Sequence, residues 1–164
     1  MPKTIKPSLQ NLTHLEILQK FRIIIQSAQK HSLNIKKKCG ISGAQLWVLQ
    51  EIAHQPLLKV GELANVMSLK QTTVSNLLET LEIKKLIKRL VDENDKRQVR
   101  LQLTPKGVIL LKKAPKPSRG SLPESLSLLD KKSQKKLNEA LSTLLETMEH
   151  VDQKSALQPL PFTR

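Results

Sequence analysis

The segment from Ser68 to Thr104 constrains the fold of this chain most, because its apolar spacing changes from a helical to an extended period. Apolar residues first recur every three or four positions, which predicts an amphipathic helix that begins at a capping box formed by Ser68 and Gln71. Two largely apolar runs, at residues 86–91 and 98–103, then flank a polar tip and predict two short strands. The segment therefore predicts a helix followed by a β-hairpin.

This helix and hairpin favour a nucleic-acid interface. The outer face of the helix carries small neutral polar side chains, which can approach base edges in a major groove. The hairpin carries basic side chains that can reach phosphates or a minor groove. The same residues are also typical of a solvated protein surface, and of the two interpretations we favour contact with DNA. The candidate contacts are Ser68, Lys70, Gln71, Thr72, Thr73, Ser75, Asn76, Lys84, Lys88, Arg89, Lys96, Arg97 and Arg100.

Arg97 and Asp95 lie at the predicted hairpin tip, and we assign them different roles. Arg97 is the candidate for a minor-groove or phosphate contact. A carboxylate is repelled by phosphate, so Asp95 is interpreted as a partner that holds Arg97 or Arg100 in place. On that interpretation Arg100 is structural rather than a contact to DNA.

Charge and composition agree with a polyanionic partner. The 164 residues include 28 Lys and Arg against 14 Asp and Glu, which gives a net charge of +14. Two Phe, one Trp and no Tyr leave few aromatic side chains on which single-stranded bases could stack, so duplex DNA is favoured. The sequence shows neither an apolar run of membrane-spanning length nor a signal peptide, and we expect a cytoplasmic protein that does not bind membranes.

The N-terminal part is predicted to contain a loose arm, a helix and the start of a DNA-binding lobe. Residues 1–9 form the arm, and residues 10–34 form a helix whose apolar surface is wider than one stripe and so needs more than one neighbour. A basic loop at residues 34–40 follows. The lobe at 42–104 begins with a second capping box, Ser42 with Gln45, and its short helix at residues 60–67 precedes the recognition helix, as in a helix-turn-helix unit.

Residues 105–153 are predicted to form the C-terminal helices. Thr104 caps the first of them, with Pro105 at its first position, and Asp130 caps the last. An a/d seam of about two heptads is too short for an isolated coiled coil, so we expect it to pack against the first helix of a second subunit in a homodimer. Residues 154–164 are expected to be a frayed tail. The seam consists of Leu137, Leu141, Leu144, Met148 and Val151.

Over residues 12–151 the sequence resembles the MarR family of bacterial transcription regulators. The predicted hairpin and the residues after it, which correspond to the wing of this family, resemble the family pattern D-x-R-x-x-x-x-x-L-T-x-x-G, and residues 61–64, 73–75 and 81–82 resemble its helix-turn-helix part. The resemblance implies a mainly α winged helix-turn-helix fold with a small β-hairpin wing and a dimer formed by the terminal helices. It also implies transcription regulation, usually repression, relieved by a small ligand or by oxidation. The wing pattern is met by Asp95, Arg97, Leu103, Thr104 and Gly107.

Two residues depart from this family pattern. Lys85 stands where the family usually has glycine after the recognition helix, and a left-handed backbone there costs a non-glycine residue about 1 kcal/mol, so we expect an altered turn. Asn76 stands where many members have arginine. Because asparagine can pair with adenine through two hydrogen bonds, the base preference is expected to differ.

Three further kinds of residue are candidates for sensing or for ligand binding. Cys39 follows three lysines, which would lower its pKa and suit an oxidation sensor, although an ordinary half-buried cysteine is the favoured interpretation. Trp47 is interpreted as core packing, with the lining of an effector pocket as the alternative. The four histidines show no metal-ligand spacing, so we predict neither a metal site nor a cofactor.

Together these observations predict a dimeric, ligand- or redox-responsive transcription regulator, most simply a repressor, that binds a pseudo-palindromic duplex operator. Two alternatives remain: an architectural protein that binds DNA regardless of sequence, and a winged-helix adaptor that binds another protein. A DNA-binding protein shows steeply salt-dependent affinity, and an adaptor does not. An enzyme is disfavoured, because the sequence offers no nucleophile–base pair, carboxylate pair or phosphate-binding loop.

Overall fold

The computed structural model describes residues 9–92 and 98–163, so the predictions for Asp95, Lys96 and Arg97 lie outside the described residues. The fold is mainly α-helical with one two-stranded antiparallel hairpin, which confirms the predicted class. The elements in chain order are α1 (Leu9–Cys39), α2 (Gly43–His54), α3 (Val60–Met67), α4 (Gln71–Ile83), β1 (Ile87–Val91), β2 (Val99–Leu103), α5 (Pro105–Lys113), α6 (Ser121–Leu128), α7 (Lys131–Glu146), and the 3-10 helices η1 (Gln153–Leu157) and η2 (Pro161–Thr163).

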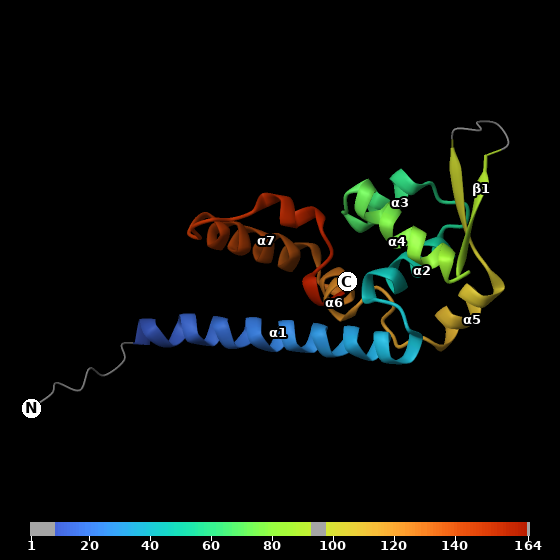
Figure 1. Cartoon of the computed structure of the whole chain (residues 1–164). Helices are drawn as coiled ribbons and strands as arrows, with labels where there is room; N and C mark the ends of the chain where they lie inside the picture. The colour runs from blue at the N-terminus through green and yellow to red at the C-terminus, as the bar shows by residue number, and fades with distance from the viewer. Residues whose placement is uncertain (1–8, 93–97, 164) are drawn as a thin grey trace, which may run out of the picture.

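The elements divide between a long helix and a lobe (Figure 1). The helix α1 extends well beyond the rest of the chain toward the N-terminus, and α2, α3, α4 and the hairpin gather near its other end. The C-terminus returns to the region where α6, α2 and α1 meet, and η2 contacts α1. The end of the described chain therefore packs against α1 close to the lobe.

The hydrophobic core lies between α2, α3, α4 and the hairpin. The apolar stripe predicted for α4 is buried through Val74, Leu78 and Leu81, which confirms its orientation. Leu46 and Leu63 are fully buried on the helices that face it. Burial of such side chains contributes about 2 kcal/mol each, which is enough to hold α4 in one rotational setting.

The hairpin is joined to the lobe by a third extended segment that the sequence analysis did not identify. The strands pair from Ile87 with Leu103 to Val91 with Val99. The amide of Leu101 donates to the carbonyl of Leu58 (3.0 Å), and Lys59 forms a bridge with Arg100. Strand β2 is therefore bonded on both sides, to β1 and to residues 58–59, which fixes the base of the hairpin relative to the lobe.

Short-range capping signals predicted several helix ends correctly. Ser42 and Gln45 form the predicted capping box, with donor–acceptor distances of 2.9 and 3.2 Å. Thr104 caps α5 with Pro105 at its start, and Asp130 caps α7. The amide and hydroxyl of Ser133 both donate to the Asp130 carboxylate, which lowers the pKa of that carboxyl.

Two predicted helix ends near the lobe were wrong. Residues 34–39 of the expected loop instead form the end of α1, where three lysines interact favourably with the negative end of the helix dipole and Ile35 is fully buried. Ser68 does not cap α4: it has a left-handed backbone (φ 52°) and ends α3, whereas a cap residue is extended. Lys70 is the residue that precedes the first turn of α4.

Two predictions for the C-terminal region were also wrong. Helix α7 ends at Glu146, so Met148 and Val151 lie beyond it and the apolar seam is shorter than expected. Residues 154–163 are not frayed: they form η1 and η2, and their backbone bonds to the lobe and to α1. These bonds join residues far apart in the sequence, which local patterning cannot reveal.

Lys85 adopts the left-handed conformation (φ 57°), so the turn after α4 is retained rather than altered. The Lys85 amide donates to the backbone carbonyl of Glu82, and the Leu86 amide donates to that of Leu81. The Lys85 carbonyl in turn accepts from the Thr104 hydroxyl (2.7 Å). These bonds hold a non-glycine residue in a conformation that glycine adopts without steric cost.

We therefore expect Lys85→Gly to raise the free energy of unfolding by about 1 kcal/mol, measured by urea denaturation. The control is Lys84→Gly, which removes the same charge at a right-handed position (φ −73°) and should instead lower stability by about 0.5 kcal/mol. Equal effects of the two substitutions would show that the left-handed backbone carries no cost here.

Candidate nucleic-acid interface

Helix α4 is held with one face in the core and the other toward solvent. Val74 and Leu78 are fully buried, while Thr72, before Val74, and Asn76, between the two, are exposed. Thr73 and Ser75 are half-buried at the edges of the outer face. The α4 residues expected to meet base edges therefore divide into an exposed pair and a flanking pair.

The remaining candidates lie near the two ends of α4 and along the hairpin. Those that the structure leaves exposed are Ser68, Gln71, Lys84, Lys88 and Arg89, and those half-buried are Lys70 and Arg100. They come from the α3–α4 turn, the end of α4 and the hairpin, which the core brings onto one lobe. The structure thus gathers the described candidates around α4, although it does not test their contact with DNA.

Two of the arginines are engaged within the protein. The Arg89 guanidinium pairs with the Glu82 carboxylate (3.1 Å), which links β1 to the end of α4. Arg100 donates to the Asp92 carboxylate (2.6 Å) and to the carbonyl of Leu57 (3.3 Å). Asp92 is thus a carboxylate that holds Arg100 at the base of the hairpin, a role that the sequence analysis assigned to Asp95, and these contacts favour the structural interpretation of Arg100.

The C-terminal segment contacts the start of α4, which sequence reasoning missed. The Lys70 amide donates to the carbonyl of Leu157 (3.1 Å). The Thr73 hydroxyl donates to the side-chain oxygen of Gln158 (3.3 Å). Two candidate DNA contacts are therefore partly covered by the same chain.

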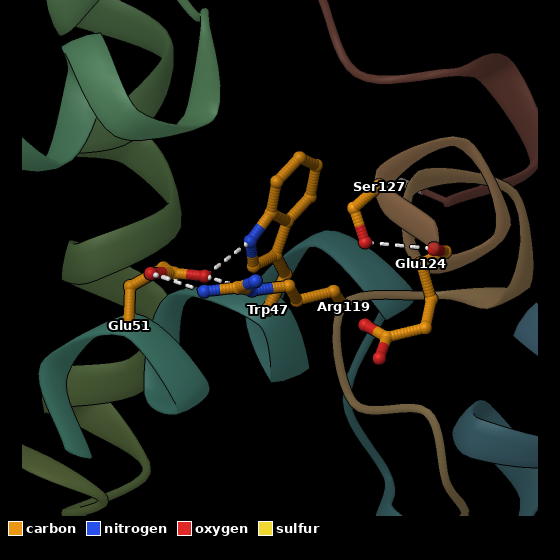
Figure 2. A network of polar contacts seen from close by, with 5 residues as sticks. All are labelled: Trp47, Glu51, Arg119, Glu124 and Ser127. Carbon is orange, nitrogen blue, oxygen red and sulfur yellow. Dashed lines mark hydrogen bonds and ion pairs between the residues drawn. The ribbon is translucent and has the colours of Figure 1, made fainter. Parts of the chain in front are cut away.

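A buried acidic side chain links α2 to the segment before α6 (Figure 2). Glu51 is nearly inaccessible (5% exposed) and accepts from the Trp47 indole (2.8 Å) and from the Arg119 Nε (2.6 Å) and Nη2 (3.3 Å). The hydrogen bond with Glu51 raises the pKa of the Arg119 guanidinium, which therefore stays protonated at neutral pH. The sequence analysis missed this pair, because the partners are 68 residues apart.

Trp47 also lines a small cavity between α1, α2 and the C-terminal residues. The volume of about 50 Å³ suits water molecules, whereas sites for drug-sized ligands span roughly 300–1,000 Å³. The cavity wall includes Ala28, His31 and Phe162. In this arrangement the space beside Trp47 is filled largely by the chain itself.

Cys39 does not have the environment that the redox hypothesis required. It is the last residue of α1 and is half-buried. Burial raises the pKa of the Cys39 thiol above its ordinary value of 9.0, and the Lys38 charge lowers it by less. Desolvation thus outweighs the neighbouring charge, which favours the interpretation of Cys39 as an ordinary half-buried cysteine.

Neither a metal-binding cluster nor a membrane span is found among the described residues. Within residues 9–92 and 98–163, no three His, Cys, Asp or Glu side chains are arranged to hold a metal ion. In the part of the chain that the structure covers, none of the helices combines the length and apolar character that a membrane span requires.

Comparisons with known proteins match the lobe and the whole fold. Residues 41–99 match the model of the MarR family. The HTH-type transcriptional repressor MdtR of Bacillus subtilis (strain 168) is 34% identical over 94 residues, which cover 57% of this chain and 61% of MdtR. The chain thus spans less than two thirds of the length of that relative.

Two solved structures illustrate the likeness in three dimensions. A MepR-like protein complexed with pseudoligands is 23% identical, with a TM-score of 0.57 over 80% of this chain and 94% of that one. The S. aureus MepR–DNA complex is 25% identical, with a TM-score of 0.52 over 84% of this chain and 98% of that one. The first supports the winged-helix fold, and the second is a similar chain bound to DNA.

Proposed function

We propose that this chain is a transcription regulator of the MarR family, whose model residues 41–99 match, and that it binds duplex DNA with α4 in the major groove. One observation carries the proposal: α4 has one face buried in the core and one exposed face. The exposed face carries short polar side chains, which include Thr72 and Asn76. A rigid helix with such a face can approach base edges closely.

The electrostatics of the lobe support DNA as the partner. The net charge of +14 favours a polyanion, and the exposed Lys84 and Lys88 lie at the end of α4 and on β1, where they can reach phosphates. The basic wing tip at residues 95–97 lies outside the described residues, and contact of Arg97 with the minor groove stays part of the proposal.

A homodimer is the second part of the proposal. Helix α1 leaves Leu15, Leu18 and Ile23 exposed, and α7 leaves Leu141 and Leu144 exposed. Large apolar side chains along two helices are stabilised when a second subunit covers them. The two α4 helices of such a dimer would bind the two halves of a pseudo-palindromic operator. We further propose that the protein is a repressor and that an effector relieves repression by weakening its binding to DNA.

The test is an electrophoretic mobility shift with DNA from immediately upstream of the gene's own operon, beside unrelated DNA of equal length. The proposal expects preferential retention of the upstream fragment, with affinity that falls steeply as salt increases. Equal retention of both fragments would instead indicate an architectural protein, and no retention at any salt concentration would contradict DNA binding.

Asn76→Ala tests the reading face directly. If Asn76 bonds a base edge, its loss should weaken binding to the preferred fragment by about 1–3 kcal/mol and leave binding to unrelated DNA unchanged. The control is Asn65→Ala, the same chemical change at an exposed position of α3. Equal effects of the two substitutions on the preferred fragment would contradict the assignment of Asn76.

A further inference from the structure

The C-terminal tail, defined as Gln153–Thr163, connects two parts of the molecule that lie far apart in the sequence. Near its middle, Leu157 and Gln158 bond to the start of α4, through the Lys70 amide and the Thr73 hydroxyl. Near its end, the Phe162 carbonyl accepts from the Ser32 hydroxyl of α1 (2.7 Å). The tail thus spans from the dimer-forming helix of the proposed function to its DNA-reading helix.

The distal end of the tail occupies a well-packed site. Ser32 is only 5% exposed, and the bond to Phe162 satisfies its hydroxyl. Phe162 and Thr163 line the small cavity beside Trp47. Packing there is close, because a methyl group added at Gly43 would lie 3.1 Å from the Ser32 Oγ and 3.5 Å from the Thr163 Cβ. The tail is therefore anchored by shape and by a buried hydrogen bond.

The proximal contact lies at the functionally critical end of α4. In helix-turn-helix proteins, the N-terminal residues of the recognition helix contact base edges. The tail lies against that end, since its contacts are Lys70, immediately before α4, and Thr73, in its first turn. A groove wall and the tail cannot both occupy this position.

We propose that the C-terminal tail is an autoinhibitory segment, which covers the N-terminal end of α4 when docked and must leave before DNA can bind. This inference rests on the proposed function, because it requires α4 to be the DNA-reading helix. Only molecules with an undocked tail can bind DNA, so the apparent DNA affinity equals the intrinsic affinity multiplied by the undocked fraction.

The effect is steric rather than electrostatic. The tail sequence QKSALQPLPFT contains one charged residue, Lys154, and no acidic residue that could imitate a phosphate. A positive charge would by itself favour DNA binding. Inhibition by this segment therefore has to come from the space that it occupies.

Two full-length variants with the same charge change separate docking from electrostatics. Phe162→Asp replaces a half-buried ring beside Trp47 with a short carboxylate and should release the tail, because the apolar contacts of the ring are lost and the new charge loses part of its hydration when docked. Ala156→Asp adds the same charge at an exposed tail residue and should leave the tail docked. Charge alone predicts that both variants bind DNA slightly more weakly than the unchanged protein.

The first readout is DNA affinity in the mobility shift assay described above. We expect Phe162→Asp to bind about threefold or more tightly than Ala156→Asp, against the direction that its charge predicts. Equal affinity of the two variants, or weaker binding by Phe162→Asp, would overturn the autoinhibitory role.

The second readout is amide hydrogen exchange of the DNA-free protein, which does not depend on the proposed function. The Lys70 amide should exchange faster in Phe162→Asp than in Ala156→Asp, while the Val74 amide, bonded to the Lys70 carbonyl, stays protected because α4 is intact. Equal exchange at Lys70 would overturn the docked tail. Faster exchange at Lys70 together with no DNA binding by any variant would refute the proposed function, and the autoinhibitory role with it.

Discussion

Replacing Gly107 with alanine is expected to lower the free energy of unfolding by about 3 kcal/mol, the largest single-residue effect that we predict. A Cβ atom at this position would lie 2.1 Å from the backbone oxygen of Leu86, far inside van der Waals contact. Leu86 cannot move away easily, because it is buried and its carbonyl accepts from the Thr104 amide (3.1 Å). Helix α5 would have to shift as a whole, with loss of its capping bond.

The control for this substitution is Gly61→Ala in α3. A Cβ atom there meets no heavy atom within 4 Å, and alanine is favoured over glycine inside a helix by about 0.5–1 kcal/mol. Urea denaturation at one protein concentration should therefore show opposite changes for the two variants, the concentration being fixed because a dimer's stability depends on it. A Gly107→Ala protein as stable as Gly61→Ala would show that the α5 contact is not tight.

Short-range chemistry explains which parts of the fold the sequence predicts. The Ser42 capping box and the Pro105 helix start are decided by residues within one turn of each other, and both are observed. The same kind of reasoning misassigned Ser68, because a serine three residues before a glutamine also occurs at the end of a helix. The left-handed backbone of Ser68 is set by the α3–α4 turn rather than by its own side chain.

Contacts across the chain explain what the sequence could not reveal about the candidate site. The polar face of α4 follows from its helical period, and so do the candidate contacts on it. The contact between Thr73 and Gln158 joins residues 85 positions apart. The hydrogen bond between Ser32 and Phe162 joins residues 130 positions apart. Pro159 and Pro161 are typical of a frayed chain end, which is why the sequence predicts one. The segment is ordered because the residues next to these prolines form backbone hydrogen bonds.

The pair of Glu51 and Arg119 is the second site where a single change should have a large effect. Arg119→Met leaves the Glu51 carboxylate, whose side chain is 6% exposed, with Trp47 as its remaining donor among those described here. We expect the free energy of unfolding to fall by about 2 kcal/mol, less than for a fully buried pair, because the Arg119 side chain is 35% exposed and water can partly replace it. Urea denaturation at neutral pH measures this loss.

A double-mutant cycle shows whether the loss comes from the stranded carboxylate. Glu51→Gln keeps an oxygen that can accept from the Trp47 indole but removes the charge, and should cost about 1 kcal/mol by itself. In the double variant Glu51→Gln with Arg119→Met no buried charge is left unpaired, so its loss should be smaller than the sum of the single losses by about 1 kcal/mol or more. Strictly additive losses would contradict a direct interaction, and the link between α2 and the segment before α6 would then have to come from apolar packing around Trp47.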